Sequence, residues 1–186
     1  LQHPAARYVL NTFQQEWEHG KTSIESWTLC CDGSYYEGTK SREEATGWGF
    51  SVSYLATHTA TPYLVHVSGG PVTDADLVHF AITKQGNDVG EAVALHYALL
   101  YAAIHIPPGS NITLIYDSTA TGKAAEGIYN TPANTNAIAR ATRGVVHRLQ
   151  ANNISITFQH TYSHEGQPLN ELVDGVAKAG AKQIFL

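Results

Sequence analysis

The sequence contains no methionine, only two cysteines and no long hydrophobic run. The longest apolar stretch, residues 98–106, is too short and too interrupted to cross a bilayer, so we expect no membrane-spanning helix. Cys30 and Cys31 are adjacent, and neighbours in a strand point to opposite faces, so we expect no disulfide between them. The start of the chain lacks the basic and apolar segments of a secretion signal. We therefore expect an intracellular protein, in the cytoplasm or nucleus, and the missing methionine at position 1 indicates a piece of a larger polypeptide.

Charged residues are few, at 15%, and the formal net charge is −5. Proteins that bind nucleic acid usually carry a basic excess, so the total charge argues against such a partner. The distribution weakens this objection, because residues 1–119 contain 5 basic and 12 acidic side chains whereas residues 120–186 contain 6 basic and 4 acidic ones. The C-terminal third is weakly basic, and a nucleic-acid partner is not excluded.

Apolar strand-forming segments alternate with alanine-rich helical ones, and 186 residues suffice for one sizeable core. We therefore expect one layered α/β (α+β) domain over residues 26–186, preceded by an extension or linker over residues 1–25. The hydrophobic pattern predicts strands over residues 26–34, 47–54, 63–67, 111–118 and 154–158. It predicts helices over residues 88–106, 120–127, 135–150 and 168–182.

The order of these elements predicts a five-stranded mixed sheet. The first three strands follow one another across short connections, as in an antiparallel meander. The helix over residues 88–106 then makes a right-handed crossover, which places the fourth and fifth strands parallel to the first. Between residues 68 and 84 the pattern is ambiguous. Gly69, Gly70 and Pro71 are expected to end the third strand, and residues 77–82 fit either an extension of that strand or an inserted loop.

Two of the predicted strands end in an aspartate, Asp32 on the first strand and Asp117 on the fourth. Ligand sites in such sheets lie at the carboxyl ends of parallel strands, so we expect the two side chains to lie side by side. Carboxylates that lie close together share a proton or bind a cation, and a hard ion such as Mg²⁺ takes oxygen ligands. Glu91, near the start of the crossover helix, and Asp174, on the last helix, are the expected third and fourth ligands.

The order and surroundings of these acids resemble the type 1 ribonuclease H family. The most specific segment is the last, in which His164 lies ten residues before Asp174, and Pro168 and Asn170 lie six and four residues before it. The resemblance covers about residues 27–182. Within the family, the chain is most similar to the ribonuclease H domains of retrotransposon reverse-transcriptase polyproteins, which share an element resembling Gly70-Pro71-Val72-Thr73-Asp74. The other matching segments are Asp32-Gly33-Ser34, Glu91 and Asp117-Ser118.

This resemblance implies a ribonuclease H-like fold and an endoribonuclease that hydrolyses the RNA strand of RNA/DNA hybrids with two Mg²⁺ ions, for which Mn²⁺ substitutes. It implies that Asp32 contacts both ions, that Glu91 and Asp117 complete one ion site, and that Asp174 completes the other. His164 would assist proton transfer or product release.

The resemblance also implies contacts with the substrate. Asn87 matches an asparagine that contacts the minor groove of the hybrid, where the 2′-hydroxyl distinguishes RNA from DNA. Lys84 resembles a basic residue of a DNA-phosphate pocket, and Asn170 of the closing motif is a further substrate contact. Gly86 and Asp88 depart from the polar neutral residues common around that pocket. The chain lacks the extra basic helix of some cellular members, so weak activity is expected of it in isolation. In the segment between the fourth and fifth strands, Arg140, Arg143 and Arg148 are the cationic side chains expected to help hold the substrate.

Two other functions are compatible with the same fold. One is a catalytically inactive module that packs against a reverse transcriptase or holds nucleic acid, although the retention of four clustered, mutually repelling acids argues against it. The other is a DNA-cutting relative such as a transposase or integrase core, which usually lacks the closing motif around His164. We expect no zinc site, no phosphate-binding loop and no cysteine nucleophile. The expected partners are the hybrid and a reverse transcriptase or another polyprotein region.

Overall fold

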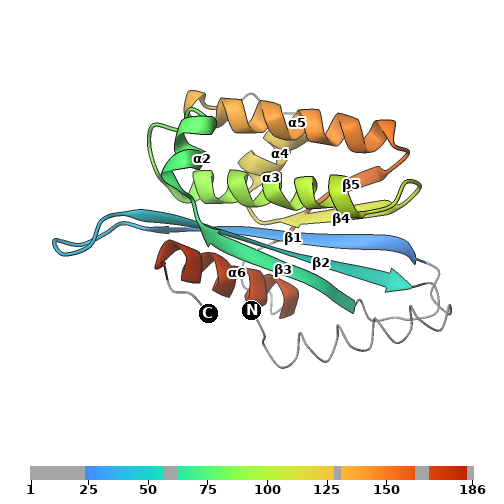
Figure 1. The fold of residues 1–186 in the computed structure, drawn as a ribbon, viewed down its shortest axis with the longest axis horizontal. Helices are drawn as coiled ribbons and strands as arrows, with labels where there is room; N and C mark the ends of the chain where they lie inside the picture. The colour runs from blue at the N-terminus through green and yellow to red at the C-terminus, as the bar shows by residue number, and fades with distance from the viewer. Residues whose placement is uncertain (1–23, 57–62, 128–130, 162–167, 184–186) are drawn as a thin grey trace.

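The computed structural model describes residues 24–56, 63–127, 131–161 and 168–183, which form a five-stranded sheet with helices on both faces (Figure 1). The strands are β1 (Ile24–Tyr36), β2 (Ala45–Ala56), β3 (Tyr63–Pro71), β4 (Asn111–Tyr116) and β5 (Ser155–His160). The helices are α2 (Asp74–His79), α3 (Asn87–His105), α4 (Thr119–Glu126), α5 (Asn136–Ala151) and α6 (Pro168–Ala181), with a 3-10 turn at Ala133–Thr135. None of the described helices is long and apolar enough to cross a membrane.

The strand order is β3-β2-β1-β4-β5. β1, β2 and β3 pair antiparallel, whereas β1, β4 and β5 pair parallel, which confirms the predicted mixed sheet. In the parallel register, Cys30 of β1 lies opposite Ile115 of β4. Asp32 and Asp117 each follow two residues later, so the sheet itself places them at the same end.

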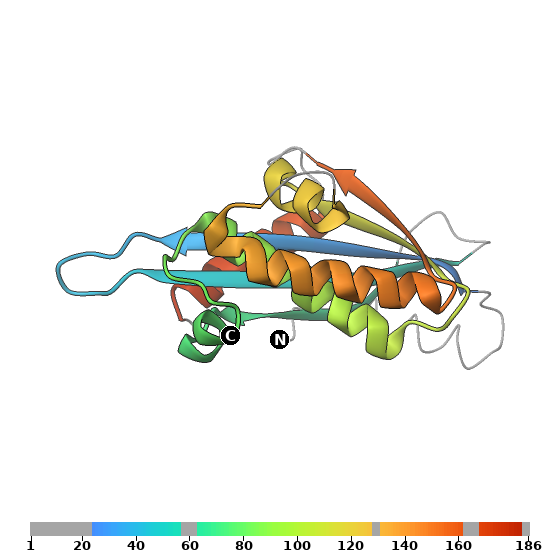
Figure 2. The same cartoon turned by 90° about the horizontal axis from the view of Figure 1, so that it is seen from above.

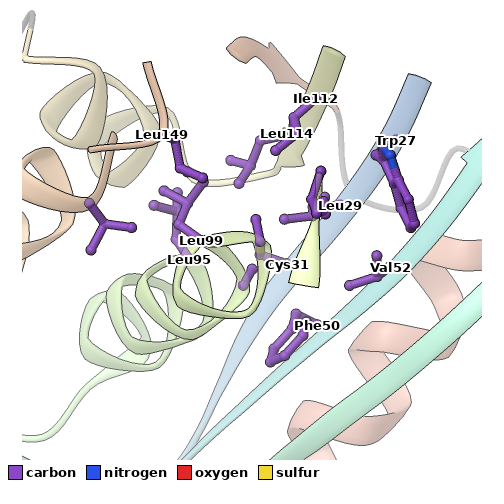
Figure 3. Close-up of a cluster of buried hydrophobic side chains, with 14 of the residues drawn as sticks. Trp27, Leu29, Cys31, Phe50, Val52, Leu95, Leu99, Ile112, Leu114 and Leu149 are labelled. Carbon is purple, nitrogen blue, oxygen red and sulfur yellow. The ribbon is translucent and has the colours of Figure 1, made fainter. Parts of the chain in front are cut away.

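Helices α3, α4 and α5 lie on one side of the sheet, and α6 lies on the other. α3 packs on β1 and β2, with α4 and α5 on the same side, and α6 packs on the opposite face against β1, β2 and β3 (Figures 1 and 2). The main core lies between β1 and α3, where Leu29 and Cys31 pack near Leu95 and Leu99 (Figure 3). Burial of one leucine side chain stabilises a fold by about 1.5–3 kcal/mol, so this layer holds α3 firmly against the sheet.

β3 continues through Gly69 and Gly70 to Pro71, so the prediction that these residues end the strand was wrong. Gly69 of β3 and Gly180 of α6 are needed because the two elements lie close together, whereas a Cβ on Gly70 would meet nothing closer than 3.8 Å. A Cβ on Gly69 would lie 2.1 Å from Val176 Cγ1, and a Cβ on Gly180 would lie 2.3 Å from the carbonyl oxygen of Gly70. Pro71 is tolerated because it ends an edge strand, where a missing N–H costs little.

Residues 74–79 form helix α2, so both interpretations were wrong for residues 77–79, whereas residues 80–82 lie in a turn and loop. Thr73 and Asp76 form a capping box. Thr73 Oγ1 accepts a hydrogen bond from the N–H of Asp76 (3.1 Å), and Asp76 Oδ2 accepts one from the N–H of Thr73 (2.8 Å). This spacing is a known signal of a helix start. The hydroxyl of Tyr97 donates to Asp76 Oδ1 and so ties α2 to α3.

Candidate active site

The carboxyl groups of Asp32, Glu91 and Asp117 meet where the parallel pairing of β1 with β4 ends, just after β4 and four residues before the end of β1. One oxygen from each lies within 4.8 Å of the other two. Asp32 and Glu91 are only 7% and 4% exposed, and Asp117 is half-buried, so the group is largely removed from water. Within the described part of the chain, this is the one group of three or more acids, histidines or cysteines close enough together to hold a metal ion.

Close contact between two backbones brings Glu91 to Asp32. Gly33 follows Asp32 on β1, and a Cβ on Gly33 would lie 2.2 Å from the backbone nitrogen of Glu91. On the helix side, a Cβ on Gly90 would lie 2.5 Å from the carbonyl oxygen of Gly47. Glycine alone lacks a Cβ, so these glycines let the backbones of the sheet and α3 lie close together. Any other residue would force the two backbones further apart.

Replacement of Gly33 by alanine is therefore expected to destabilise the protein by about 3 kcal/mol or more, since backbone atoms must shift to admit the methyl group. Urea unfolding measures the effect. Gly144→Ala is the matched control, because a Cβ there meets nothing within 4 Å on α5. It should stabilise the helix by up to about 1 kcal/mol. Similar losses for both variants would show that Gly33 is not a close-contact position.

Burial and mutual repulsion oppose ionisation of these acids. Burial, followed by the charges of Asp117 and Asp174, raises the pKa of Asp32 to about 7. Burial, followed by the neighbouring Asp117, raises the pKa of Glu91 well above its usual range. The N–H of Gly33 donates to Asp32 Oδ1 (2.8 Å), whereas Asp117 Oδ1 is buried without a hydrogen-bond partner among the described groups. The cluster lacks a positive charge, and a divalent cation with oxygen ligands would supply it.

Asp174 approaches the cluster from α6, on the opposite face of the sheet from α3. It is not part of the group of three, but its charge contributes to the raised pKa of Asp32. Its Oδ2 lies 2.7 Å from Nζ of Lys178, one turn further along the helix. The structure thus places all four predicted acids in one region, with three in close contact and the fourth paired to a lysine.

His160, at the end of β5, holds the backbone of Asp117. Its Nε2 lies 2.9 Å from the carbonyl oxygen of Asp117, and because a carbonyl only accepts, Nε2 carries the proton. The N–H of Thr161 also donates to the carbonyl of Tyr116 (2.8 Å). No sequence pattern singles out this histidine as a partner of an aspartate 43 residues away. His164, for which the sequence predicts a role, lies outside the described residues.

Asn134 holds the loop that carries Lys84. Its Oδ1 accepts hydrogen bonds from the N–H groups of Thr83 (2.9 Å) and Lys84 (3.1 Å), and its Nδ2 donates to the carbonyl of Lys84 (2.9 Å). The side chains of Lys84 and Asn87 are exposed, and Asn87 lies one turn before Glu91 on α3. Asn170 is half-buried, one turn before Asp174 on α6. Sequence reasoning missed Asn134, because nothing local connects it to a loop 50 residues earlier.

The arginines of α5 differ in their surroundings. Nη1 of Arg143 donates to the carbonyl of Ala124 near the end of α4 (3.0 Å), so this arginine stabilises the fold. Arg140 and Arg148 are exposed. Of the three arginines, Arg140 and Arg148 therefore form no side-chain hydrogen bond or ion pair with the described residues and remain available to a partner.

Cys30 and Cys31 are buried and carry free thiols. Burial raises the pKa of Cys30 to about 11 and that of Cys31 well above its usual value. Since the thiolate is the reactive form, neither residue is a nucleophile at neutral pH.

The structure has the ribonuclease H fold, as predicted, and the solved structures that it resembles include several ribonuclease H1 enzymes. Ribonuclease H1 of the archaeon Halobacterium salinarum matches with a TM-score of 0.57 at 18% identity, over 85% of this chain and 98% of its own. The protease-reverse transcriptase of prototype foamy virus matches with a TM-score of 0.57 at 15% identity, over 86% of this chain and 21% of the viral chain. LC11 ribonuclease H1, in complex with an RNA/DNA hybrid, matches with a TM-score of 0.54 at 14% identity, over 84% and 97%. No protein-family profile and no curated protein sequence matches the chain.

Proposed function

We propose that the chain is an endoribonuclease that hydrolyses the RNA strand of RNA/DNA hybrids. One observation carries the proposal: the carboxyl groups of Asp32, Glu91 and Asp117 are crowded together where two parallel strands of a ribonuclease H fold stop pairing. Burial of acids that repel one another costs stability unless a ligand compensates for it. The hybrid bound to the similar LC11 enzyme supports the substrate class.

The donor set fits two Mg²⁺ ions, for which Mn²⁺ would substitute. Carboxylate oxygens are the ligands that these ions prefer, and the buried Asp117 Oδ1 lacks a protein partner among the described residues. Asp32, Glu91 and Asp117 would hold one ion, and Asp32 and Asp174 the other. When bound, the ions would lower the pKa of the attacking water and stabilise the leaving 3′ oxygen.

The chain's own residues would position the hybrid. Lys84, on the loop held by Asn134, would contact a phosphate of the DNA strand, and phosphate contacts fix the register of a duplex. Asn87, one turn before Glu91, would donate to the minor groove, and Asn170 would contact the substrate from α6. His164 would accept or donate a proton beside the scissile phosphate.

We further propose that residues 26–186 are the nuclease domain of a retroelement reverse-transcriptase polyprotein, with residues 1–25 as its linker or extension, acting in the cytoplasm or nucleus. The similarity to the foamy virus protein, of which the match covers 21%, supports this context. A second candidate is a catalytically inactive module that holds the hybrid or packs against a reverse transcriptase. The four acids retained in one region weigh against it.

Cleavage assays test the proposal. The chain is incubated with Mg²⁺ or Mn²⁺ and with end-labelled RNA/DNA hybrid, double-stranded RNA or double-stranded DNA, and EDTA is added in parallel reactions. We expect cuts in the RNA strand of the hybrid alone, which EDTA abolishes. Cleavage of double-stranded DNA would refute the proposal. Binding of the hybrid without cleavage in either metal would favour the inactive module.

Asn134→Ala is expected to raise the KM for the hybrid about five- to tenfold and to change kcat little, because the lost hydrogen bonds hold the Lys84 loop and not a carboxylate. Steady-state kinetics with the hybrid measure both constants. Asn152→Ala, at the exposed end of α5, is the control and should leave both unchanged. A loss confined to kcat would contradict a role in substrate positioning.

A further inference from the structure

Lys178 is the one basic side chain among the described residues that forms an ion pair with an acid of the candidate active site. Its Nζ lies 2.7 Å from Asp174 Oδ2, and the two side chains are 53% and 36% exposed. An exposed lysine is charged at physiological pH, so the ammonium group lies directly on one proposed ligand.

This pairing separates Asp174 from the other three acids. Asp32, Glu91 and Asp117 have no basic partner in the described structure, so a cation bound among them displaces no ammonium. A cation that uses Asp174 Oδ2 must take the place of Lys178 Nζ or share the oxygen with it. Two positive charges a few ångströms apart repel each other, and the repulsion is larger for a divalent ion than for a monovalent one.

We propose that Lys178 is an internal competitor for the second cation. It occupies Asp174 when that ion is absent and lowers the affinity of the site that Asp174 completes. The two ion sites then fill at separate concentrations, first the site of Asp32, Glu91 and Asp117, then the site at Asp174. This inference rests on the proposed function for the existence of the two sites, and adds which of them is weaker and the residue that makes it so.

Titration calorimetry of the full chain with MgCl₂ at pH 8 and constant ionic strength tests the proposal. Lys178→Gln is expected to tighten the weaker of two Mg²⁺ sites by about tenfold and to leave the tighter site unchanged, since it removes one unit charge beside a divalent ion. Lys178→Arg keeps the charge and should behave as the unsubstituted chain does. Lys123→Gln, which removes the other ion pair, Lys123–Glu126 on α4, is the matched control and should change nothing.

A gain in affinity is a useful readout because damage to the fold does not produce it. An unchanged or weakened second site in Lys178→Gln would overturn the inference, and so would an equal gain in Lys123→Gln.

The same titrations separate the inference from the proposed function. If the unsubstituted chain takes up no Mg²⁺, the metal site of the proposed function fails together with the inference. If Mg²⁺ binds but Lys178→Gln matches the unsubstituted chain, only the inference fails. If Lys178→Gln tightens the second site in a chain that cuts no hybrid, the inference stands and the proposed activity does not.

Discussion

Replacement of Asp117 by asparagine is expected to abolish cleavage of the hybrid and, at the same time, to make the metal-free chain more stable. The carboxylate is one of three crowded together, and its Oδ1 has no hydrogen-bond partner among the described residues. An amide removes one negative charge and offers two N–H donors to the neighbouring acids. We expect a gain of about 1–2 kcal/mol in the free energy of unfolding, or about 2–8 °C in Tm for a domain of this size. The loss of cleavage should be at least about 10³-fold, because a metal ligand is removed.

Two measurements on the same preparation check this prediction. Single-turnover cleavage with saturating Mg²⁺ gives the loss of activity, and thermal unfolding in EDTA gives the change in stability. Asp74→Asn, which alters an exposed acid in the first turn of α2, is the control. It should leave cleavage unchanged and should not raise the Tm. If Asp117→Asn lowered the Tm in EDTA, the carboxylate would be stabilising the fold rather than straining it.

The metal-free chain is expected to lose stability as the pH rises from about 4 to about 7, and Mg²⁺ is expected to restore it at the upper end of this range. Asp32 has a pKa of about 7 in the folded chain and about 3.9 when unfolded. Between these values the folded state binds more protons than the unfolded state, so stability present below pH 4 is lost as the pH rises through 7. The raised pKa of Glu91 acts in the same direction. The loss from Asp32 is about 2–4 kcal/mol.

The rise in Tm that Mg²⁺ produces, measured at two pH values, separates the titration of these carboxyl groups from other pH effects on stability. A ligand at ten times its Kd stabilises by about 1.4 kcal/mol, or about 3–6 °C in this size range. We expect such a rise in Tm at pH 8 and little at pH 5.5, where protons occupy the same oxygens. His96 has the opposite effect on the pH dependence of stability. Burial lowers its pKa to about 4, so the stability that it contributes to the fold is lost as the pH falls from 6.5 towards 4. It contributes equally with and without Mg²⁺ and cancels from the difference. If Mg²⁺ raised the Tm equally at pH 5.5 and pH 8, the prediction that protons and Mg²⁺ compete for these carboxyl groups would be wrong.

The sheet and the three-acid group could be predicted because both depend on short-range patterns. The apolar runs that end at Asp32 and Asp117 predict two buried strands, and the long alanine-rich segment between them predicts the crossover that makes those strands parallel neighbours. Once the ends of these two strands and their pairing are known, the carboxyl groups of Asp32 and Asp117 are expected to lie together, and no side-chain contact has to be known in advance. Asp174 could be placed only through its resemblance to a family motif, since a single helix pattern does not say which sheet face it covers.

The parts that could not be predicted depend on contacts between distant segments. Asn134 reaches the Lys84 loop, and His160 reaches the carbonyl of Asp117, across 50 and 43 residues. The two glycines at positions 69 and 70 predict a break when only the local sequence is considered. In the structure β3 continues through them, and Gly69 leaves room for Val176 of α6, a contact between distant segments. Helix α2 was missed although its capping box was present in the sequence, because it buries none of its residues and so shows no helical hydrophobic stripe.

Of the four acids, Asp32 lies on β1, Asp117 follows β4, and Glu91 and Asp174 lie on helices. The helix that supplies Asp174, α6, is the most C-terminal of the described elements. During synthesis, a ribosome exposes β1, α3 and β4 well before α6, so the growing chain carries three ligands without the fourth. On the proposed function, the ability to cut would appear only when α6 closes over the second face of the sheet. Copies that lack α6 would therefore be unable to degrade hybrids, and activity would appear only after the C-terminal part of the domain has folded.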